Sequence, residues 1–109
     1  MNFAYDQKDI GNFYNVYSDL ISFWKKIFKE DIYVCKYEKL IDNSEFEIKK
    51  MIDFCDLDWD PNCLNHQSNQ SGIKTASVNQ ARRPIYNTSK NLNKNYSDNL
   101  VEMFGILKN

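Results

Sequence analysis

Arginine is scarce in this chain. Of the 14 basic residues in its 109-residue sequence, only Arg82 and Arg83 are arginines, and all the others are lysines. Long apolar runs are also lacking, since none approaches the roughly 20 residues that span a bilayer. Residues 1–9 have neither the basic nor the apolar region of a signal peptide. We therefore expect a cytoplasmic protein that does not associate with membranes.

An excess of charge of one sign is missing as well. The sequence has 15 acidic residues against 14 basic ones, so its formal net charge is −1. Nucleic-acid binding usually requires an overall basic field. Binding of nucleic acid through Arg82, Arg83 and the lysines is therefore disfavoured.

Patterns for disulfides or metal ions are absent too. Cys35, Cys55 and Cys63 are odd in number and lack metal-ligand spacing, and His66, the single histidine, has no obvious partner ligand. We expect reduced, mostly buried thiols and no metal site.

Aromatic residues, by contrast, are abundant, at 15% of the chain within an apolar total of 42%. This composition suffices for one domain with a modest core. Residues 9–28 have the clearest pattern, a 3.6-residue apolar period that predicts a helix with Asp6 as its N-cap. We expect the aromatic stripe of this helix to be core. The stripe consists of Ile10, Phe13, Tyr14, Tyr17, Leu20, Ile21, Trp24, Ile27 and Phe28.

The segment 32–37, Ile-Tyr-Val-Cys-Lys-Tyr, is short, β-branched and aromatic, which predicts a buried strand. It is the one convincing strand in the sequence. A lone strand cannot satisfy its backbone N–H and C=O groups. We therefore expect it to pair with another copy or with strands outside these residues.

A second helix is predicted at about 45–55, where Ser44 and Glu47 have capping-box spacing. Its apolar face would consist of Ile48, Met51, Ile52 and Cys55.

The remaining chain predicts shorter elements. Pro61 can start a helical turn through Leu64, and the polar stretch 65–80 indicates a long loop. A last helix is expected at about 97–107, with Ser97 as N-cap. Its inward residues would be Leu100, Val101, Phe104 and Leu107.

The two arginines lie in a segment rich in hydroxyl and amide side chains, which includes Thr75, Ser77 and Gln80. Arginine offers a planar fork of donors that grips phosphate or carboxylate at two points. The segment therefore suits an anion with several oxygens, such as a nucleotide phosphate. The alternative is a solvated loop whose arginines pair with nearby acidic residues.

Taken together, these landmarks resemble the C-terminal part of sulfotransferases related to tyrosylprotein sulfotransferase, especially the bacterial branch often fused to tetratricopeptide repeats. The order and spacing of the similar segments make the resemblance specific. These segments are 3–6, 14–24, 34–41, 54–60, 63–64, Asn69, 74–77 and 84–86.

The resemblance implies a three-layer α/β/α fold related to P-loop kinases. Residues 1–109 would form the C-terminal part of the domain, mainly helical with one strand of the parallel sheet. The family transfers a sulfuryl group from 3′-phosphoadenosine 5′-phosphosulfate (PAPS) to a hydroxyl, often on tyrosine. By this resemblance the cofactor-binding residues are Tyr37, Ser77, Gln80, Arg82, Arg83, Tyr86 and Lys90.

Two of these assignments have alternatives. Tyr37 can instead be a strand-end tyrosine buried in the core, and Glu38 after it is expected to accept hydrogen bonds from nearby backbone. Lys90 or Lys94 could supply a cationic charge, although neither is at the family's basic position.

The chain also departs from the family. Leu92 and Asn93 replace a basic residue and a tryptophan, and Ser71 stands where arginine is common. His66 and Gln67 replace a phenylalanine–histidine pair, so His66 is not at the family's histidine position and we do not expect it to be functional. These changes indicate relaxed constraint or a divergent branch.

The family's N-terminal strand, its phosphosulfate loop, its catalytic base and the residues gripping the 3′-phosphate have no match in this chain. We therefore expect a fragment, a truncated product or one half of a split enzyme, inactive alone. Its partners would be the missing N-terminal half or a second copy, and a hydroxyl acceptor, possibly tyrosyl. The alternative is a non-catalytic helical interaction module that keeps the scaffold.

Overall fold

The computed structural model describes residues 2–108, and no strand forms among them. The chain divides into two compact units. The first unit combines residues up to Ile32 with residues from Asn91 onward, and the second runs from Tyr33 to Lys90. The first consists of η1 (Asn2–Tyr5), α1 (Gln7–Ile27), η4 (Leu92–Asn99) and α5 (Val101–Ile106).

Helix α1 confirms the predicted first helix and its cap. The Asp6 carboxylate accepts hydrogen bonds from the backbone N–H groups of Lys8 and Asp9, at 2.8 and 3.1 Å. These bonds satisfy two donors that have no partner within the helix. The helix ends at Phe28, whose N–H donates to the Trp24 carbonyl.

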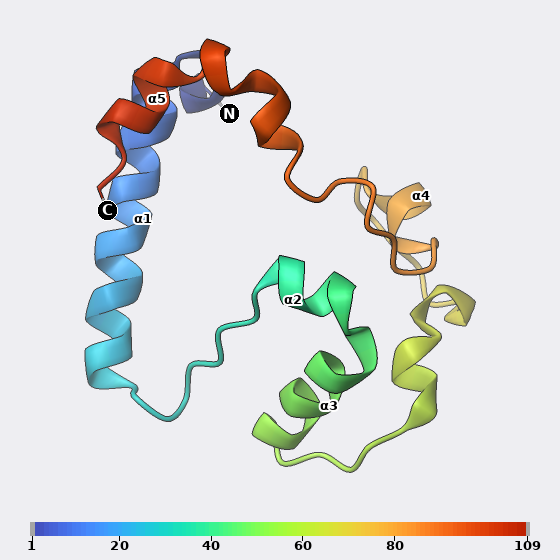
Figure 1. Ribbon diagram of the computed structural model, residues 1–109. Coiled ribbons are helices and arrows are strands. Elements are labelled where there is room, and N and C mark those ends of the chain that lie inside the picture. The colour runs from blue at the N-terminus through green and yellow to red at the C-terminus, as the bar shows by residue number, and fades with distance from the viewer. Residues whose placement is uncertain (1, 109) are drawn as a thin grey trace. The chain divides into compact units, whose positions relative to one another are not determined.

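Helix α5 packs on α1 (Figure 1), and hydrogen bonds from two side-chain amides of α1 hold it in place. Gln7 donates to the Asn99 carbonyl at 2.7 Å and accepts from the Met103 N–H at 3.2 Å. Asn15 likewise donates to the Ile106 carbonyl at 2.8 Å. The amides supply partners for backbone groups at both ends of a short helix that cannot satisfy them itself.

The same face of α1 allows a close approach of α5. Gly11, midway between the two amides, is buried, and a Cβ atom built on it would lie 3.0 Å from Cγ2 of Ile106. One turn further, Asn15 accepts from the Lys108 N–H at 2.9 Å, and Asp19 pairs with the Lys108 ammonium at 3.0 Å. Residues four apart share a helix face. The contact is therefore a row of polar side chains that is interrupted at Gly11, where the side chain of Ile106 comes close to the backbone.

The prediction that the aromatic stripe of α1 forms a core is wrong for this structure. No apolar side chain among the described residues is buried, and Phe13, Tyr17 and Leu20 are each at least 50% exposed. The physical reason is that α5 is short and covers only part of α1, so no second layer lies over the stripe within this unit. The rings pack locally instead, as Trp24 does on Phe28 with centroids 5.5 Å apart.

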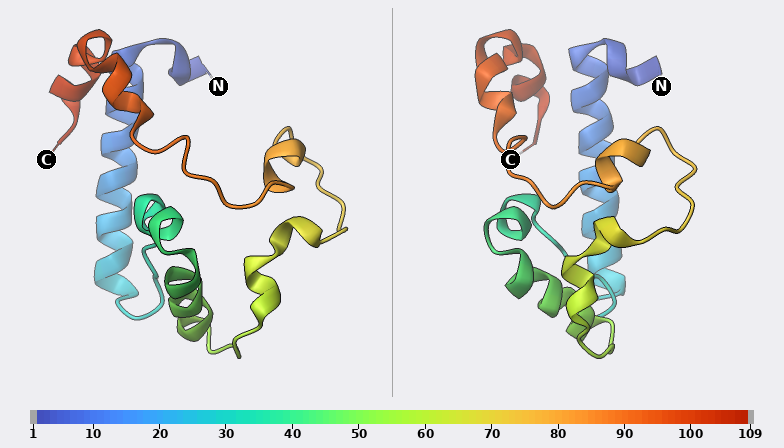
Figure 2. Two further views of the ribbon diagram at one scale, coloured as in Figure 1. Left: turned by 45° about the vertical axis from the view of Figure 1, so that its right-hand side comes forward. Right: turned by 90° about the vertical axis from the view of Figure 1, so that its right-hand side faces the viewer.

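The second unit, Tyr33 to Lys90, contains five short helices. They are α2 (Tyr37–Asp42), α3 (Ser44–Phe54), η2 (Pro61–Leu64), η3 (His66–Ser68) and α4 (Val78–Ala81). Helices α2 and α3 pack on each other and appear in green in Figure 2.

The predicted strand does not form. Residues 32–36 are irregular, Val34 is 53% exposed, and Tyr37 starts a helix that the sequence analysis missed. A strand requires a hydrogen-bonded neighbour, and the described residues provide none. The one-strand part of the fold-class prediction is therefore wrong for this chain.

The capping box predicted for the second helix is also wrong. Asn43 holds the N-cap position without a side-chain hydrogen bond, and Ser44 is already the first helical residue. Glu47 does not reach back to the cap. Its side chain is buried, and its carboxylate lies 3.4 Å from the Lys50 ammonium.

Further along, Pro61 starts the expected helical turn, and the Asp60 carboxylate caps it by accepting from the Asn62 N–H at 2.8 Å. The stretch 65–80 is more ordered than predicted, since it holds η3 and the start of α4.

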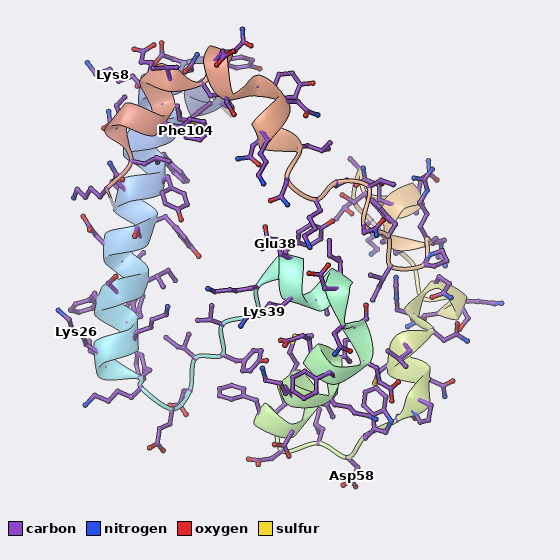
Figure 3. The ribbon with its side chains drawn as sticks, in the orientation of Figure 1. Lys8, Lys26, Glu38, Lys39, Asp58 and Phe104 are labelled. Atoms are coloured by element: carbon purple, nitrogen blue, oxygen red, sulfur yellow. The ribbon has the colours of Figure 1, made fainter. Side chains whose placement is uncertain are left out.

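The last predicted helix is divided into two, because η4 ends before Leu100 and α5 begins after it. Val101 and Phe104, expected to face inward, are 67% and 39% exposed. Figure 3 labels Phe104 on α5.

The three cysteines are free, but Cys35 and Cys55 are exposed and Cys63 is partly exposed, so the prediction of mostly buried thiols is wrong. Within residues 2–108, no helix is long and apolar enough to cross a membrane.

Candidate anion-binding site

Four of the seven residues predicted to bind cofactor line one surface cavity of about 210 Å³. All of its walls come from the second unit. The lining residues are Tyr37, Leu40, Ile41, His66, Gln80, Arg83, Ile85 and Tyr86.

One wall of the cavity is the first turn of α2. Tyr37 is the first residue of this helix, and Leu40 and Ile41 follow at helical spacing, so all three project from one face. The wall is apolar apart from the tyrosine hydroxyl. Tyr37 is 43% exposed, so it is a cavity residue rather than the buried core tyrosine of the alternative reading.

The opposite wall is α4 and the segment after it. The backbone turns here through hydrogen bonds from the Ala81 N–H to the Ser77 carbonyl (2.9 Å) and from the Arg83 N–H to the Gln80 carbonyl (3.1 Å). This turn places Gln80 and Arg83, three residues apart, on the same cavity. An amide and a guanidinium therefore face the aromatic and aliphatic wall of α2.

The two arginines differ in their partners. Arg82 donates from Nη1 to the Asn69 carbonyl at 2.6 Å and from Nη2 to the Ser71 carbonyl at 3.1 Å, which fastens the preceding loop. The Arg83 guanidinium has no hydrogen bond or ion pair with any described residue. Its planar fork of donors is thus available to a ligand.

The solvated-loop alternative predicted that the arginines would pair with acidic residues. Among residues 2–108, neither Arg82 nor Arg83 forms a salt bridge. One arginine binds backbone carbonyls and the other lines the cavity, so acidic pairing does not account for either.

Three predicted residues do not line this cavity. The guanidinium of Arg82 is hydrogen-bonded to the preceding loop. Ser77 is at the N-cap position of α4, and its side chain makes no capping hydrogen bond. The Lys90 ammonium lies 2.7 Å from both carboxylate oxygens of Asp42, which offset its charge. Glu38, expected to accept hydrogen bonds from nearby backbone, is exposed in the first turn of α2 (Figure 3) and makes no hydrogen bond with any described residue.

His66 is a cavity residue that sequence reasoning missed. It also lines a larger cavity of about 490 Å³. No motif marks it, because its place in the cavity depends on the fold of residues 61–69. The larger cavity is lined by Asp60, Asn62, Cys63, Asn65, His66, Ser68 and Asn69.

The larger cavity is the weaker candidate for a ligand. Its polar groups are used in local turns, as when the Asn69 side chain accepts from the Ser71 N–H and Ser68 donates to the Asn65 carbonyl. It has no arginine or lysine to hold an anion. No group of metal-ligating side chains able to hold an ion occurs in the described part of the chain.

Comparison with known proteins shows the family to which this chain belongs. Residues 5–102 match the sulfotransferase domain family, so this chain belongs to that family. It is also similar to an uncharacterized protein of Aquifex aeolicus (strain VF5), with 32% identity over 108 residues. That match covers 99% of this chain but 14% of the relative's length. No solved structure matches.

Sulfotransferases generally use PAPS, which carries phosphate groups and a flat adenine ring. An unpaired guanidinium beside two tyrosines suits a phosphate next to a flat ring. Sites for whole ligands of that size usually measure about 300–1,000 Å³. At about 210 Å³, this cavity is smaller than a site for a whole ligand of that size.

Proposed function

We propose that the second unit supplies part of the nucleotide site of a PAPS-dependent sulfotransferase, and that it holds the adenosine and phosphate end. The observation that carries this proposal is the juxtaposition of Arg83, whose guanidinium is unpaired among the described residues, with Tyr37 and Tyr86 in one cavity. Membership in the sulfotransferase family supports it.

Each residue has a distinct part in this proposal. The Arg83 fork donates two hydrogen bonds to phosphate oxygens and offsets their charge. The rings of Tyr37 and Tyr86 pack on the base or donate from their hydroxyls, and Gln80 adds an amide donor. Leu40 and its apolar neighbours reduce the water around the phosphate, which strengthens these contacts.

The nucleotide, when bound, supplies the sulfuryl group, and the acceptor in this proposal is a hydroxyl, possibly of tyrosine. Transfer also requires a base to take the acceptor proton and donors around the leaving 5′-phosphate. In the family these parts precede the segment that this chain resembles. We propose that the 109 residues bind nucleotide but are inactive alone, and that they act in the cytoplasm with the N-terminal half of a sulfotransferase domain.

The test is calorimetric titration of the chain with adenosine 3′,5′-bisphosphate. Arg83→Ala should weaken binding at least about tenfold, since a charge-assisted contact contributes about 1.5–3 kcal/mol. Arg83→Lys should recover only part of the loss, because lysine cannot make a two-point contact.

Lys74→Ala is the matched control. It removes the same charge from an exposed position of the same unit that lies outside the cavity. If Lys74→Ala and Arg83→Ala weakened binding equally, the attraction would be nonspecific electrostatics, and the proposed site would be refuted.

A second candidate function is a non-catalytic interaction module. The exposed aromatic side chains of α1, including Phe13 and Tyr17, favour it because monomers seldom leave large apolar patches open. This candidate predicts partner binding without nucleotide binding, so the same titration separates the two functions.

A further inference from the structure

His66 stands at the wall shared by the two cavities of the second unit. On one side it faces the cavity of Arg83 and Tyr37, and on the other the cavity that contains Asp60 and Cys63. Its imidazole makes no hydrogen bond with any described residue, so both ring nitrogens are available.

The backbone around His66 is fixed even though its ring is not bonded. Asn65 ends the η2 turn by donating from its N–H to the Asn62 carbonyl at 2.9 Å. His66 then starts η3, and its carbonyl accepts from the Asn69 N–H at 3.1 Å. Arg82 holds the Asn69 carbonyl in turn. The loop is therefore tied on both sides of the residue that carries the imidazole.

We propose that His66 is a second, pH-dependent anion-binding side chain of the Arg83 cavity, which rests on the proposed nucleotide binding there. Histidine is the side chain that ordinarily becomes cationic between about pH 8 and pH 5. A protonated His66 would give the cavity two cations on separate elements, η3 and the segment after α4.

The charges around the imidazole determine the sign of the effect. The charged side chains that line these cavities with His66 are Arg83 in one and Asp60 in the other. Tyr37, Tyr86 and Cys63 are the other titratable side chains that line the two cavities. A bound phosphate favours the imidazolium, and by reciprocity protonation favours the phosphate.

The experiment compares wild type with His66→Gln in titrations with adenosine 3′,5′-bisphosphate at about pH 8 and about pH 5.5. Phosphate esters themselves take up a proton near about pH 6, but this affects both proteins equally. The measured quantity is therefore the ratio of their dissociation constants at each pH.

We expect a ratio near one at the higher pH, and the variant to bind about three- to fivefold more weakly at the lower pH. This is the range of an exposed ion pair, and His66 is exposed. His66→Lys, cationic throughout, should bind more tightly than wild type at the higher pH. Circular dichroism of each variant checks that the fold is kept.

The outcomes distinguish this inference from the proposed function. A ratio near one at both pH values, with binding still lost in Arg83→Ala, would overturn the role of His66 and leave the nucleotide site standing. Absence of binding by the wild type at both pH values would overturn both.

Discussion

Neighbouring residues of the same type have different surroundings in this chain, and Arg82 and Arg83 are the clearest case. The first donates to two backbone carbonyls, and the second faces a cavity. The sequence predicts that the pair gathers oxygen ligands, but which oxygens each one reaches depends on the turn that follows α4. The same holds for His66, whose place beside Arg83 follows from two short helical turns rather than from any motif.

The difference between the arginines gives a prediction at the residue scale. Arg82→Ala removes both bonds to the loop at Asn69 and Ser71, so amide exchange there should accelerate. Because the bonds are exposed, the loss of stability should be about 1 kcal/mol or less. Hydrogen exchange measured by mass spectrometry checks this.

Arg83→Ala is the control for the loop experiment, since its guanidinium makes no bond to that loop. Equal acceleration of exchange in both variants would show that the carbonyl contacts of Arg82 do not hold the loop.

At the scale of elements, two of the local signals were reliable, whereas the capping box of Ser44 and Glu47 was not. The Asp6 cap and the 3.6-residue period predicted α1, and Pro61 predicted η2, because a cap or a fixed φ works within a few residues. The segment 32–37 failed because β propensity is realised only beside another strand. Four cavity residues were predicted from the sequence, whereas the aliphatic wall with Leu40 was not.

The contact of α5 with α1 gives a prediction at this scale. Gly11→Val should destabilise the contact by about 1–3 kcal/mol, because its Cβ atom would lie 3.0 Å from Cγ2 of Ile106. Exchange of the Met103 and Lys108 amides, which α1 side chains hold, should accelerate.

Gly105→Val is the matched control, since a Cβ there meets nothing within 4 Å and glycine is a poor helix residue. It should leave stability unchanged or raise it slightly. If both variants lowered the thermal midpoint equally, the loss would come from valine in a helix and not from the close approach at Gly11.

For the molecule as a whole, family membership and surface area are the decisive facts. The chain exposes 9242 Å², whereas two separate compact units of half its size would expose only about 7,700 Å² together. The difference of about 1,500 Å² is roughly twice the 800 Å² or so that each partner contributes to a standard protein interface. Large apolar side chains such as Leu20 and Leu57 are exposed in both units, so we propose that apolar surface is covered by the N-terminal half of a sulfotransferase domain or by a second copy.

This proposal predicts that the pure 109-residue chain transfers no sulfuryl group from PAPS to phenolic or peptide acceptors. A radiolabel assay with ³⁵S-labelled PAPS, run beside a titration that verifies nucleotide binding, measures this. Turnover by the chain alone would contradict the proposal, because it would place a base and 5′-phosphate donors among these residues.

The exposed stripe of α1 also predicts self-association when no other partner is present. Sedimentation velocity of the chain should show an average mass that rises with concentration. Tyr17→Lys combined with Leu20→Lys should reduce this association, because both side chains are about half exposed and apolar. Asn12→Lys with Ser22→Lys is the control, since it adds the same two charges to exposed polar positions of the same helix. Equal loss of association in both variants would attribute the effect to charge repulsion. A wild-type mass that stays monomeric at every concentration would show that the apolar stripe of α1 does not bind a second copy.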